Sequence, residues 1–491
     1  MKEIEPPQRL SAPLCVDLDG TLIRTDLLHE AVLLLVKRNP LYVFAVLFWL
    51  LKGKAGLKDE VAKRVAIDPS TLPYNGQVLD WVRSEKEKGR HTVLATASNE
   101  RLAESVALHL GCFDEVLASD SVRNLSDRMK CAELVRRFGK ARFDYAGNSS
   151  KDVVIWEQCD QAIVVEANER TLKAARRKAA VADVILRPRV TLGTWFRAAR
   201  VHQWVKNLLV FVPLLTSHRL TNLTSLRSAL ILFFALSGVA SATYVCNDLL
   251  DLNDDRKHAT KSARPFASGE ISISQAIMLA VGLFAAAVFL AFYLSLPGRV
   301  VLGCYLALTL AYSFWLKRKL ILDVLILASL YTIRIIAGGV TTHIQLSDWL
   351  LSFSLFLFIS LAICKRSSEL MNLLKSNQTR TNGRFYETGD LEPLNICGMC
   401  SGILACLLML LYGSSQQAQS LYKSPRFLYL LCPILFYWIS RLWVLTFRGV
   451  LKEDPILFAI RDKVSYVVMA AMIAVIALAT FIKVPFELFL Q

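Results

Sequence analysis

The chain has 491 residues, 54% of them hydrophobic, and a formal net charge of +16. This length favours more than one domain, and the apolar composition excludes an ordinary soluble protein. In a membrane protein, an excess of Lys and Arg is typical of cytoplasmic loops that face anionic lipid. No nucleic-acid partner is expected, because the sequence has no soluble segment in which basic and aromatic residues alternate.

Short β-like runs alternate with charged, helix-like stretches before about residue 190. The runs are "APLCVDLDG", "HTVLATAS", "RFDYAGNS" and "AIVVEAN". This alternation predicts an α/β domain with a mostly parallel sheet over residues 1–190, with chemistry in the loops after the strand ends. The N-terminus has no apolar core of signal-peptide length, so we expect this domain to stay in the cytoplasm.

"VDLDGTL" (16–22) resembles the first motif of the haloacid-dehalogenase (HAD) superfamily of phosphotransferases. A carboxylate directly after a strand can attack phosphorus to give an aspartyl-phosphate, and Mg²⁺ shields the repulsion between the reacting charges. The resemblance implies a Rossmann-like fold in which Asp17 is the nucleophile and metal ligand. Asp19 would be its acid/base partner and a second ligand.

The later motifs of this superfamily follow in the expected order. By the same resemblance, Thr96 would bind the phosphoryl oxygens with Ser98 nearby, and Lys130 would neutralise phosphate charge. Asn148 and Asp152, in "YAGNSSKD", would complete the metal site. Asn148 stands where an acid is common, and the missing charge should weaken Mg²⁺ binding. This departure therefore bears on the expected phosphatase activity and not on the expected fold.

A helical cap is expected near residues 26–75, between the first two motifs. Its run 41–51 is uncharged but too short to span a bilayer. Lys37, Arg38, Lys52 and Lys54 flank the run. This pattern fits either an interfacial helix on anionic lipid or a cap helix packed on the sheet.

Residues 191–491 are expected to form an all-α membrane domain of about nine helices, each near the ~20 residues that cross a bilayer. The apolar segments lie at 205–217, 227–246, 273–296, 299–316, 321–341, 348–364, 394–413, 426–446 and 464–482. With the N-terminus inside, four inward loops carry sixteen Lys or Arg residues and four outward loops carry five. We therefore expect a multi-pass protein of the cytoplasmic (inner) membrane.

An acidic pattern, NDxxDxxxD, ends the apolar segment 227–246 and is formed by Asn247, Asp248, Asp251 and Asp255. On a helix the three aspartates share one face, where they repel one another unless a cation lies between them. Mg²⁺ bridging to a diphosphate is the expected occupant, and the alternative is a solvated acidic loop. Basic side chains that could neutralise further phosphate oxygens follow: Arg256, His258, Lys261 and Arg264.

NDxxDxxxD in a chain of about nine helices resembles the UbiA superfamily of intramembrane prenyltransferases. The stretches "RVHQWVKNLLVFVPLL" (200–215), "YSFWLKRKLILDVLILASLYTIRIIAGG" (312–339) and "KRSSEL" (365–370) are most similar to its decaprenyl-phosphate phosphoribosyltransferase branch. This branch implies that ribose 5-phosphate moves from phosphoribosyl pyrophosphate to a polyprenyl phosphate, with Mg²⁺ and loss of diphosphate.

The residues suit this chemistry, because a leaving diphosphate needs metal and cationic neutralisation while C1 of the ribose becomes oxocarbenium-like. Asp248, Asp251 and Asp255 would hold the metal, and Asn247 would bind the substrate. The candidate ligands of the substrate or lipid phosphates are Lys206, Asn207, Lys317, Arg334, Lys365 and Arg366, oriented by Tyr312, Asp323 and Glu369. Arg334 could instead form an interhelical ion pair, and Lys317 and Lys365 could be topology anchors.

Three functions remain open at this stage. The leading hypothesis is a bifunctional membrane enzyme, in which the N-terminal domain removes the 5-phosphate from the transferase product. The alternative is a prenyltransferase that moves a polyprenyl group from its diphosphate to an aromatic acceptor, which needs the same metal cluster. The third is a transporter or scaffold that coordinates an ion. Membrane lipids are expected partners, and the sequence neither requires nor excludes a homo-oligomer.

Overall fold

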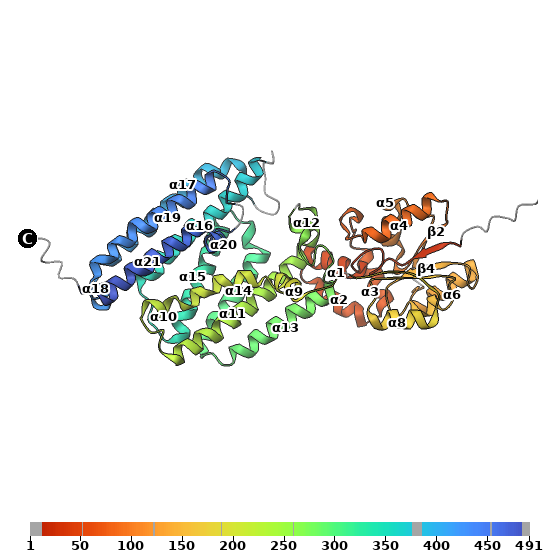
Figure 1. Cartoon of the computed structure of the whole chain (residues 1–491), viewed down its shortest axis with the longest axis horizontal. Helices are drawn as coiled ribbons and strands as arrows, with labels where there is room; N and C mark the ends of the chain where they lie inside the picture. Colours follow the sequence, from red (N-terminus) through yellow and green to blue (C-terminus); the bar gives the residue numbers. More distant parts are fainter. Residues whose placement is uncertain are drawn as a thin grey trace, which may run out of the picture. The chain divides into compact units, whose positions relative to one another are not determined.

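The structure is a computed structural model that describes residues 12–51, 53–120, 123–187, 189–258, 260–375, 385–451 and 454–483 (Figure 1). It divides into two compact units, each made of two stretches of chain. The first unit combines Met1–Arg200 with Tyr244–Val281, and the second combines Val201–Thr243 with Gly282–Gln491. The loop that carries NDxxDxxxD therefore packs with the N-terminal residues.

A six-stranded parallel sheet, in the order β3-β2-β1-β4-β5-β6, forms the centre of the first unit. Its strands are β1 (Leu14–Val16), β2 (Thr92–Asn99), β3 (Glu115–Ser119), β4 (Asp144–Gly147), β5 (Ala162–Val165) and β6 (Val181–Ile185). In β1, Cys15 and its neighbours Leu14 and Val16 belong to two different hydrophobic cores, as alternation along a strand requires. A parallel sheet covered on both faces explains why these strands are almost continuously apolar.

Helices cover both faces of this sheet (Figure 1). The helices that pack on the face of Leu14 and Val16 are α1 (Leu27–Arg38), α3 (Lys54–Ala62), α4 (Gly76–Glu87) and α5 (Glu100–Leu110). Those on the face of Cys15 are α6 (Asp127–Phe138), α7 (Val153–Trp156) and α8 (Glu169–Lys178). The predicted Rossmann-like α/β fold is confirmed. The helices α1, α2 (Tyr42–Leu51) and α3, with the 3₁₀ turn η1 (Pro69–Thr71), form the insert between β1 and β2.

The remainder of the first unit surrounds the acidic motif. It comprises α9 (Leu192–Ala198), the end of α11 (Leu223–Leu250), α12 (Leu252–Lys257), η3 (Lys261–Ala263) and the start of α13 (Ile273–Ala291). Val245 and Leu249 of α11 form a buried cluster with Ile273 and Ala276 of α13. Leu33 of α1 packs against the same cluster, so the insert of the α/β domain contacts the ends of two long apolar helices.

The second unit is helical. Its elements are η2 (Val201–Phe211), α10 (Val212–Thr216), the first part of α11, the end of α13, α14 (Leu296–Phe314), η4 (Leu316–Arg318), α15 (Leu322–Thr342), α16 (Asp348–Lys375), η5 (Thr388–Asp390), α17 (Leu391–Ser414), α18 (Gln416–Leu421), η6 (Pro425–Leu430), α19 (Leu431–Phe447), α20 (Pro455–Arg461) and α21 (Lys463–Phe481). Across both units, eight helices in the described residues are long and apolar enough to cross a membrane. This finding supports the predicted all-α membrane domain.

The ninth expected span, 205–217, is not one long α-helix. It is divided between η2, which has 3₁₀ geometry, and the short helix α10, which begins next to Pro213. The backbone of η2 approaches α15 closely: a Cβ on Gly338 would lie 2.2 Å from the carbonyl oxygen of Val210. Hydropathy alone cannot distinguish this tightly packed segment from a spanning helix.

Small residues bring the other long helices together. A Cβ on Gly398 of α17 would lie 2.3 Å from the ring of Trp443 in α19, and one on Gly402 would lie 2.7 Å from Ile439. Close approach at glycine is typical of helix packing in membranes, where van der Waals contact replaces the hydrophobic effect. As a result α16, α17 and α19 lie side by side (Figure 1).

Candidate functional site

Asp17 is buried directly after β1, at the carboxyl end of the central strand. Its Oδ1 lies 2.7 Å from the Nζ of Lys130, which reaches across from α6. The same ammonium group donates a hydrogen bond of 2.8 Å to the hydroxyl oxygen of Tyr145, and that hydroxyl donates one of 3.1 Å to Asp152. The structure thus brings together a carboxylate, a cation and a second carboxylate in one buried network.

Asp19 has a different set of partners. It accepts hydrogen bonds of 2.6 Å from the hydroxyl of Ser98 and 2.9 Å from the backbone N–H of Leu27. The Thr96 hydroxyl lies at 3.5 Å from the same carboxylate and accepts a hydrogen bond from the N–H of Ser98. Thr96 and Ser98 belong to β2, next to β1 in the sheet, which explains why sequence motifs 77 residues or more apart converge.

The loop after β4 supplies the last predicted residues. Asp152 accepts hydrogen bonds of 3.1 and 2.9 Å from the backbone N–H groups of Asn148 and Ser149. The side chain of Asn148 lies against Gly20: a Cβ there would be 2.1 Å from its Nδ2, and Gly20 has φ +77. Only glycine combines that backbone conformation with that approach.

Burial raises the pKa of both motif aspartates. The pKa of Asp17 rises to about 6, because desolvation outweighs the charge of Lys130 and the neighbouring Asp152 adds repulsion. The pKa of Asp19 rises to about 7 through desolvation and repulsion by Asp26, opposed only by hydrogen bonds such as that of Ser98. A carboxyl group with a pKa near neutrality is suited to proton transfer at physiological pH.

The oxygen donors around Asp17 have the chemistry that Mg²⁺ prefers. The charge of Asp152 raises the pKa of Asp17, and the charge of Asp17 raises the pKa of Asp19. Asn148 adds an amide next to Gly20 of the same motif. A divalent cation would relieve this repulsion, so the residues fit such an ion. Within the described part of the chain, however, no three His, Cys, Asp or Glu side chains already converge as a metal cluster.

The acidic motif NDxxDxxxD lies where α11 ends and α12 begins. Asp248 is in the last turn of α11, Asp251 precedes α12, and Asp255 lies within α12. The expected continuous helical face is wrong in detail, because α11 ends at Leu250 and Asp251 adopts φ −97 and ψ 14. The chain turns at the middle aspartate of the motif.

Two arginines hold the outer aspartates of the motif. Asp248 forms a bidentate ion pair with Arg200, whose Nε lies at 2.9 Å, and it also lies 3.1 Å from Nη1 of Arg264. Arg264 pairs with Asp255 as well, and both aspartates are buried. Asp251 is half-buried and lies 3.7 Å from Lys37 of α1. The motif is therefore a cluster of carboxylates with guanidinium groups between them.

The remaining basic residues of this loop divide into two kinds. Arg256 is turned toward the α/β domain: its Nη1 and Nη2 lie 3.1 and 2.7 Å from the carboxylate of Glu30, and its Nε donates to the carbonyl of Ala267. This arrangement does not support the predicted phosphate role of Arg256, because the guanidinium is already used. His258 and Lys261 are exposed, and burial with the nearby Lys261 charge lowers the pKa of His258.

In the second unit, Arg366 of α16 is buried between two acids. Its Nε lies 2.8 Å from Asp323, and its Nη1 pairs with Glu369. The hydroxyl of Tyr312 accepts a hydrogen bond of 3.3 Å from Nη2, and Tyr386 donates one to Asp323. The predicted orienting residues thus surround this arginine.

A second network in this unit contains two lysines and one acid. Lys206 of η2 and Lys365 of α16 lie 2.7 and 3.2 Å from the same carboxylate oxygen of Asp454. The hydroxyl of Tyr331 donates to that oxygen at 3.3 Å. Although burial would raise the pKa of Asp454, the two ammonium groups lower it below its usual range. Lys317, on η4, is half-buried.

Arg334 lies buried within α15, and its hydrogen bonds in the described residues go to neutral groups. Its Nε donates to Asn207 at 2.8 Å, and its Nη2 donates to the hydroxyl of Tyr305 at 2.9 Å. A third bond goes to the backbone carbonyl of Leu330. The interhelical ion pair that we considered for Arg334 is not found among these contacts. A buried cation with neutral neighbours suits an anionic ligand.

Four functional candidates escaped the sequence reasoning: Arg200, Tyr305, Tyr386 and Asp454. Arg200 begins the quoted stretch "RVHQWVKN", so its position was a usable signal. Asp454 lies 89 residues from Lys365 and in no motif, and only the fold brings them together.

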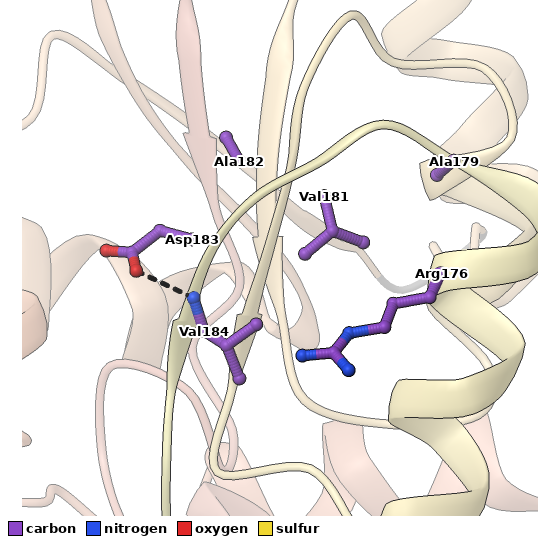
Figure 2. Close-up of a pocket in the computed structure, with 6 residues that line it drawn as sticks. All are labelled: Arg176, Ala179, Val181, Ala182, Asp183 and Val184. Carbon is purple, nitrogen blue, oxygen red and sulfur yellow. Dashed lines mark hydrogen bonds between the residues drawn. The ribbon is translucent and has the colours of Figure 1, made fainter.

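A small cavity of about 10 Å³ is lined by Lys365, Tyr331 and Asp454 among others. Two further cavities lie away from the candidate residues. A shallow hollow of about 410 Å³ next to the edge strand β6 is lined by Arg176, Ala179, Val181, Ala182, Asp183 and Val184 (Figure 2). Figure 2 shows that the carboxylate of Asp183 accepts a hydrogen bond from the backbone N–H of Val184 and does not point toward Arg176. In the second unit a cavity of about 700 Å³ is lined by residues such as Trp349 and Phe353, near the start of α16. Neither cavity contains a motif residue.

Comparison with known proteins assigns both halves. The model of the UbiA prenyltransferase family matches residues 209–371, and that of the haloacid dehalogenase-like hydrolases matches residues 14–132. An uncharacterized protein of Sinorhizobium fredii, y4nM, is 36% identical over 471 residues, covering 95% of this chain and 91% of the relative.

A second relative matches a smaller share of the chain. Decaprenyl-phosphate phosphoribosyltransferase of Mycobacterium tuberculosis is 30% identical over 302 residues, covering 60% of this chain and 98% of its own length. Among solved structures, a UbiA homolog from Archaeoglobus fulgidus bound to GPP and Mg²⁺ has a TM-score of 0.44 and 16% identity, and covers 58% of this chain and 99% of its own. The chain belongs to the UbiA prenyltransferase family and is a membrane enzyme with a haloacid dehalogenase-like hydrolase domain at its N-terminal end.

Proposed function

We propose that the membrane half transfers 5-phosphoribosyl from phosphoribosyl pyrophosphate to a polyprenyl phosphate. The observation that carries this proposal is the match to a decaprenyl-phosphate phosphoribosyltransferase over 98% of that relative's length. The number of cationic side chains supports it, because a substrate with several phosphate groups requires more neutralisation than an isoprenoid diphosphate alone.

The acidic motif supplies oxygen ligands for Mg²⁺ in this proposal. Asp248, Asp251 and Asp255 would hold the ion, which would neutralise the departing diphosphate. Arg200 and Arg264 pair with Asp248, Arg264 also pairs with Asp255, and these ion pairs fix the positions of the two carboxylates. Asn247 would bind the substrate. In the reaction a phosphate oxygen of the lipid bonds to C1 of the ribose while the bond from C1 to the diphosphate breaks.

The basic side chains of the second unit would bind phosphate groups. Arg334 is the strongest candidate, because its charge is buried among neutral partners. Lys206 and Lys365 share one carboxylate, so each retains capacity for a further anion. Arg366 is fixed by two acids, and we propose that it positions α15 against α16 with Asp323.

The α/β domain would then remove the 5-phosphate from the lipid product. Asp17 would attack phosphorus while the bond to the ribose 5-oxygen breaks, and Asp19, with its pKa near 7, would protonate that oxygen. Water would hydrolyse the aspartyl-phosphate with Asp19 as the base. Thr96 and Lys130 would bind the phosphoryl oxygens, and Asp152 with Asn148 would help to hold Mg²⁺.

The location follows from the positive-inside rule. We propose that the protein resides in the cytoplasmic membrane with the α/β domain in the cytoplasm, where phosphoribosyl pyrophosphate is available. The second candidate function is prenyl transfer to an aromatic acceptor. It is favoured by the family match alone, since the acidic motif serves both reactions.

The test is a product assay with two substrate pairs. Purified full-length protein, Mg²⁺ and labelled phosphoribosyl pyrophosphate are incubated with a polyprenyl phosphate, and a parallel reaction contains a polyprenyl diphosphate and 4-hydroxybenzoate. We expect labelled ribosyl lipid in the first reaction and no prenylated 4-hydroxybenzoate in the second. Prenylated 4-hydroxybenzoate without a ribosyl lipid would establish the second function instead.

A matched pair of variants tests the role of the acidic motif. Asp251→Asn should abolish transfer, because an amide is a poor Mg²⁺ ligand. Asp254→Asn makes the same change at an exposed residue outside the motif and should retain near-normal turnover. Equal activity in the two variants would contradict the assignment of this motif as the metal site.

A further inference from the structure

The helix α2 has an apolar face that is largely exposed in the described part of the chain. None of its ten residues, "YVFAVLFWLL", is buried. Large side chains project outward: Phe44 is 70% exposed, and Leu47 and Phe48 are 57% and 56% exposed. Leu41 and Leu51, at the two ends, are 68% and 86% exposed. A soluble domain rarely presents a continuous apolar surface of this kind without a function for it.

The opposite side of α2 accounts for its attachment. Tyr42, Val46 and Trp49 pack against the core of the α/β domain, at the spacing of one helical face. Arg64 of the following segment lies 4.8 Å above the Trp49 ring. One face of α2 is therefore fixed to the domain, and the outward face is a separate feature that core packing does not explain.

The position of α2 within its own unit points to the bilayer. Leu33 of α1 packs against the cluster formed by the ends of α11 and α13, two helices long enough to span a membrane. Lys37, at the end of α1, lies 2.7 Å from Asp254, four residues beyond the end of α11. Only three residues lie between Arg38 and Tyr42, so these two residues are at most about 14 Å apart along the chain. The helix α2 thus starts near the level where α11 and α13 leave the membrane.

The charge of the surrounding sequence complements an anionic surface. Residues 31–58 contain no Asp or Glu, and Arg38, Lys52 and Lys54 add positive charge next to α2 in the sequence. Two further cations of this segment bond within the unit, Lys37 to Asp254 and Lys58 to the carbonyl of Ala97. Cations that flank an apolar helix are attracted to anionic headgroups while the apolar face enters the acyl boundary. We propose that α2 is a membrane-anchoring helix, whose face of Leu41, Phe44, Leu47, Phe48 and Leu51 inserts into the interfacial layer of an anionic bilayer. This inference does not depend on either proposed activity.

Site-specific photocrosslinking in the full-length protein tests the proposal. Phe44 is replaced by p-benzoylphenylalanine, and the protein is placed in nanodiscs of phosphatidylcholine and phosphatidylglycerol. The matched control carries the same photoreactive residue at Tyr42, on the face that packs against the domain. We expect the probe at position 44 to give a severalfold higher yield of lipid adducts than the probe at 42. The probe at 42 should react mainly with peptides of its own α/β domain.

Other products would overturn the proposal in specific ways. Adducts of position 44 mainly with peptides from residues 282–491 would show that the chain's own helices cover this face. A covalent dimer would show that a second copy covers it. Equal lipid-adduct yields in pure phosphatidylcholine and in the mixed bilayer would exclude recognition of anionic lipid. Both variants should retain wild-type elution in detergent, which separates these outcomes from misfolding.

Discussion

The two aspartates of the first HAD motif show how neighbouring carboxylates acquire different chemistry from their surroundings. Burial is the largest influence on the pKa of both, but at Asp17 the ammonium group of Lys130 opposes it and favours the ionised form that the proposed nucleophile needs. Asp19 has hydroxyl and amide donors and the repelling charge of Asp26, without such a cation, and its pKa rises further, to about 7. Different environments that separate the roles of two acids are a recurring device of hydrolytic sites.

The raised pKa of Asp19 predicts a pH-dependent stability of the metal-free domain. Between about pH 4 and about pH 7 the folded state binds more protons than the unfolded state. The free energy of unfolding should therefore be highest at the low end of this window and fall as pH rises through about 7, by on the order of a few kcal/mol. The change in the free energy of unfolding can be measured by hydrogen exchange of the backbone amides of β1 and β4. The experiment is run over this pH range in the presence of a chelator, and the rates are corrected for intrinsic exchange.

Two controls sharpen this experiment. Asp19→Asn should flatten the pH dependence, because an amide does not titrate. Added Mg²⁺ should stabilise the wild type most at the upper end of the window, where the carboxylates are ionised. An unchanged slope in Asp19→Asn would assign the effect to another group, with Asp17 the next candidate.

Gly20 offers a second prediction at the residue scale. In Gly20→Ala the new Cβ would meet Asn148 at 2.1 Å in a backbone conformation that L residues avoid. We expect the domain to lose about 1–3 kcal/mol of stability and most of the proposed phosphatase activity. Gly76→Ala is the control, because no atom lies within 4 Å of that Cβ, and it should change stability by no more than about 0.5 kcal/mol. Similar losses in both variants would contradict a specific role for this contact.

At the scale of helices, the link between α1 and α12 joins the insert of the α/β domain to the acidic motif. The Glu30–Arg256 pair is nearly inaccessible, with side chains 3% and 7% exposed, and Thr25 donates a further hydrogen bond to Glu30. Lys37–Asp254 and Lys257–Asp68 lie around it and are exposed. The buried pair is therefore the structural centre of this contact, since exposed pairs contribute little.

Glu30→Gln should loosen α1 and α12 together. Removal of one partner leaves a buried guanidinium without its counter-charge, which typically costs about 3–5 kcal/mol. Amide hydrogen exchange should accelerate in both helices, whereas Lys257→Met should have little effect because that pair is exposed. Adding Arg256→Met to Glu30→Gln should recover part of the loss. Faster exchange in α1 alone would show that the stabilities of the two helices are not coupled.

The sequence predicted these elements unevenly, for physical reasons. Asp17 and Asn148 each follow a strand that is an apolar run ending in motif residues. The local sequence pattern was therefore sufficient to predict these two strands and the positions of both residues. The turn at Asp251 was not predicted, because helical spacing continues through it and only tertiary contacts such as Arg264 with Asp255 distinguish two helices from one. The expected span 205–217 failed for a related reason: hydropathy does not report 3₁₀ geometry.

At the scale of the whole molecule, long-range pairs were the main feature that sequence could not supply. The partners Lys206 and Asp454 are 248 residues apart, and Glu30 and Arg256 are 226 apart. Family resemblance identified one member of each pair, and the fold identified the other. The candidate transferase residues are consequently distributed over both units, whereas the candidate phosphatase residues all lie in the first.

This distribution predicts that the two proposed activities can be separated by a single substitution. Asp17→Asn retains the size of the side chain but cannot form the aspartyl-phosphate, and Asp17 makes no contact with the acidic motif in the described structure. Transfer should therefore continue, and the 5-phosphorylated lipid should accumulate in place of its dephosphorylated form. Mass spectrometry of the lipids formed from phosphoribosyl pyrophosphate and polyprenyl phosphate measures the ratio.

Asp251→Asn is the complementary variant in this last experiment. It should stop formation of both lipids, yet it should still dephosphorylate a 5-phosphoribosyl lipid that is supplied ready-made, because its α/β domain is unchanged. The same phosphorylated lipid in equal amount from wild type and Asp17→Asn would mean that the α/β domain does not process this product. Asn148 would then be the first residue to restore to an acid, since Asn148→Asp returns the missing negative charge to the Mg²⁺ ligands.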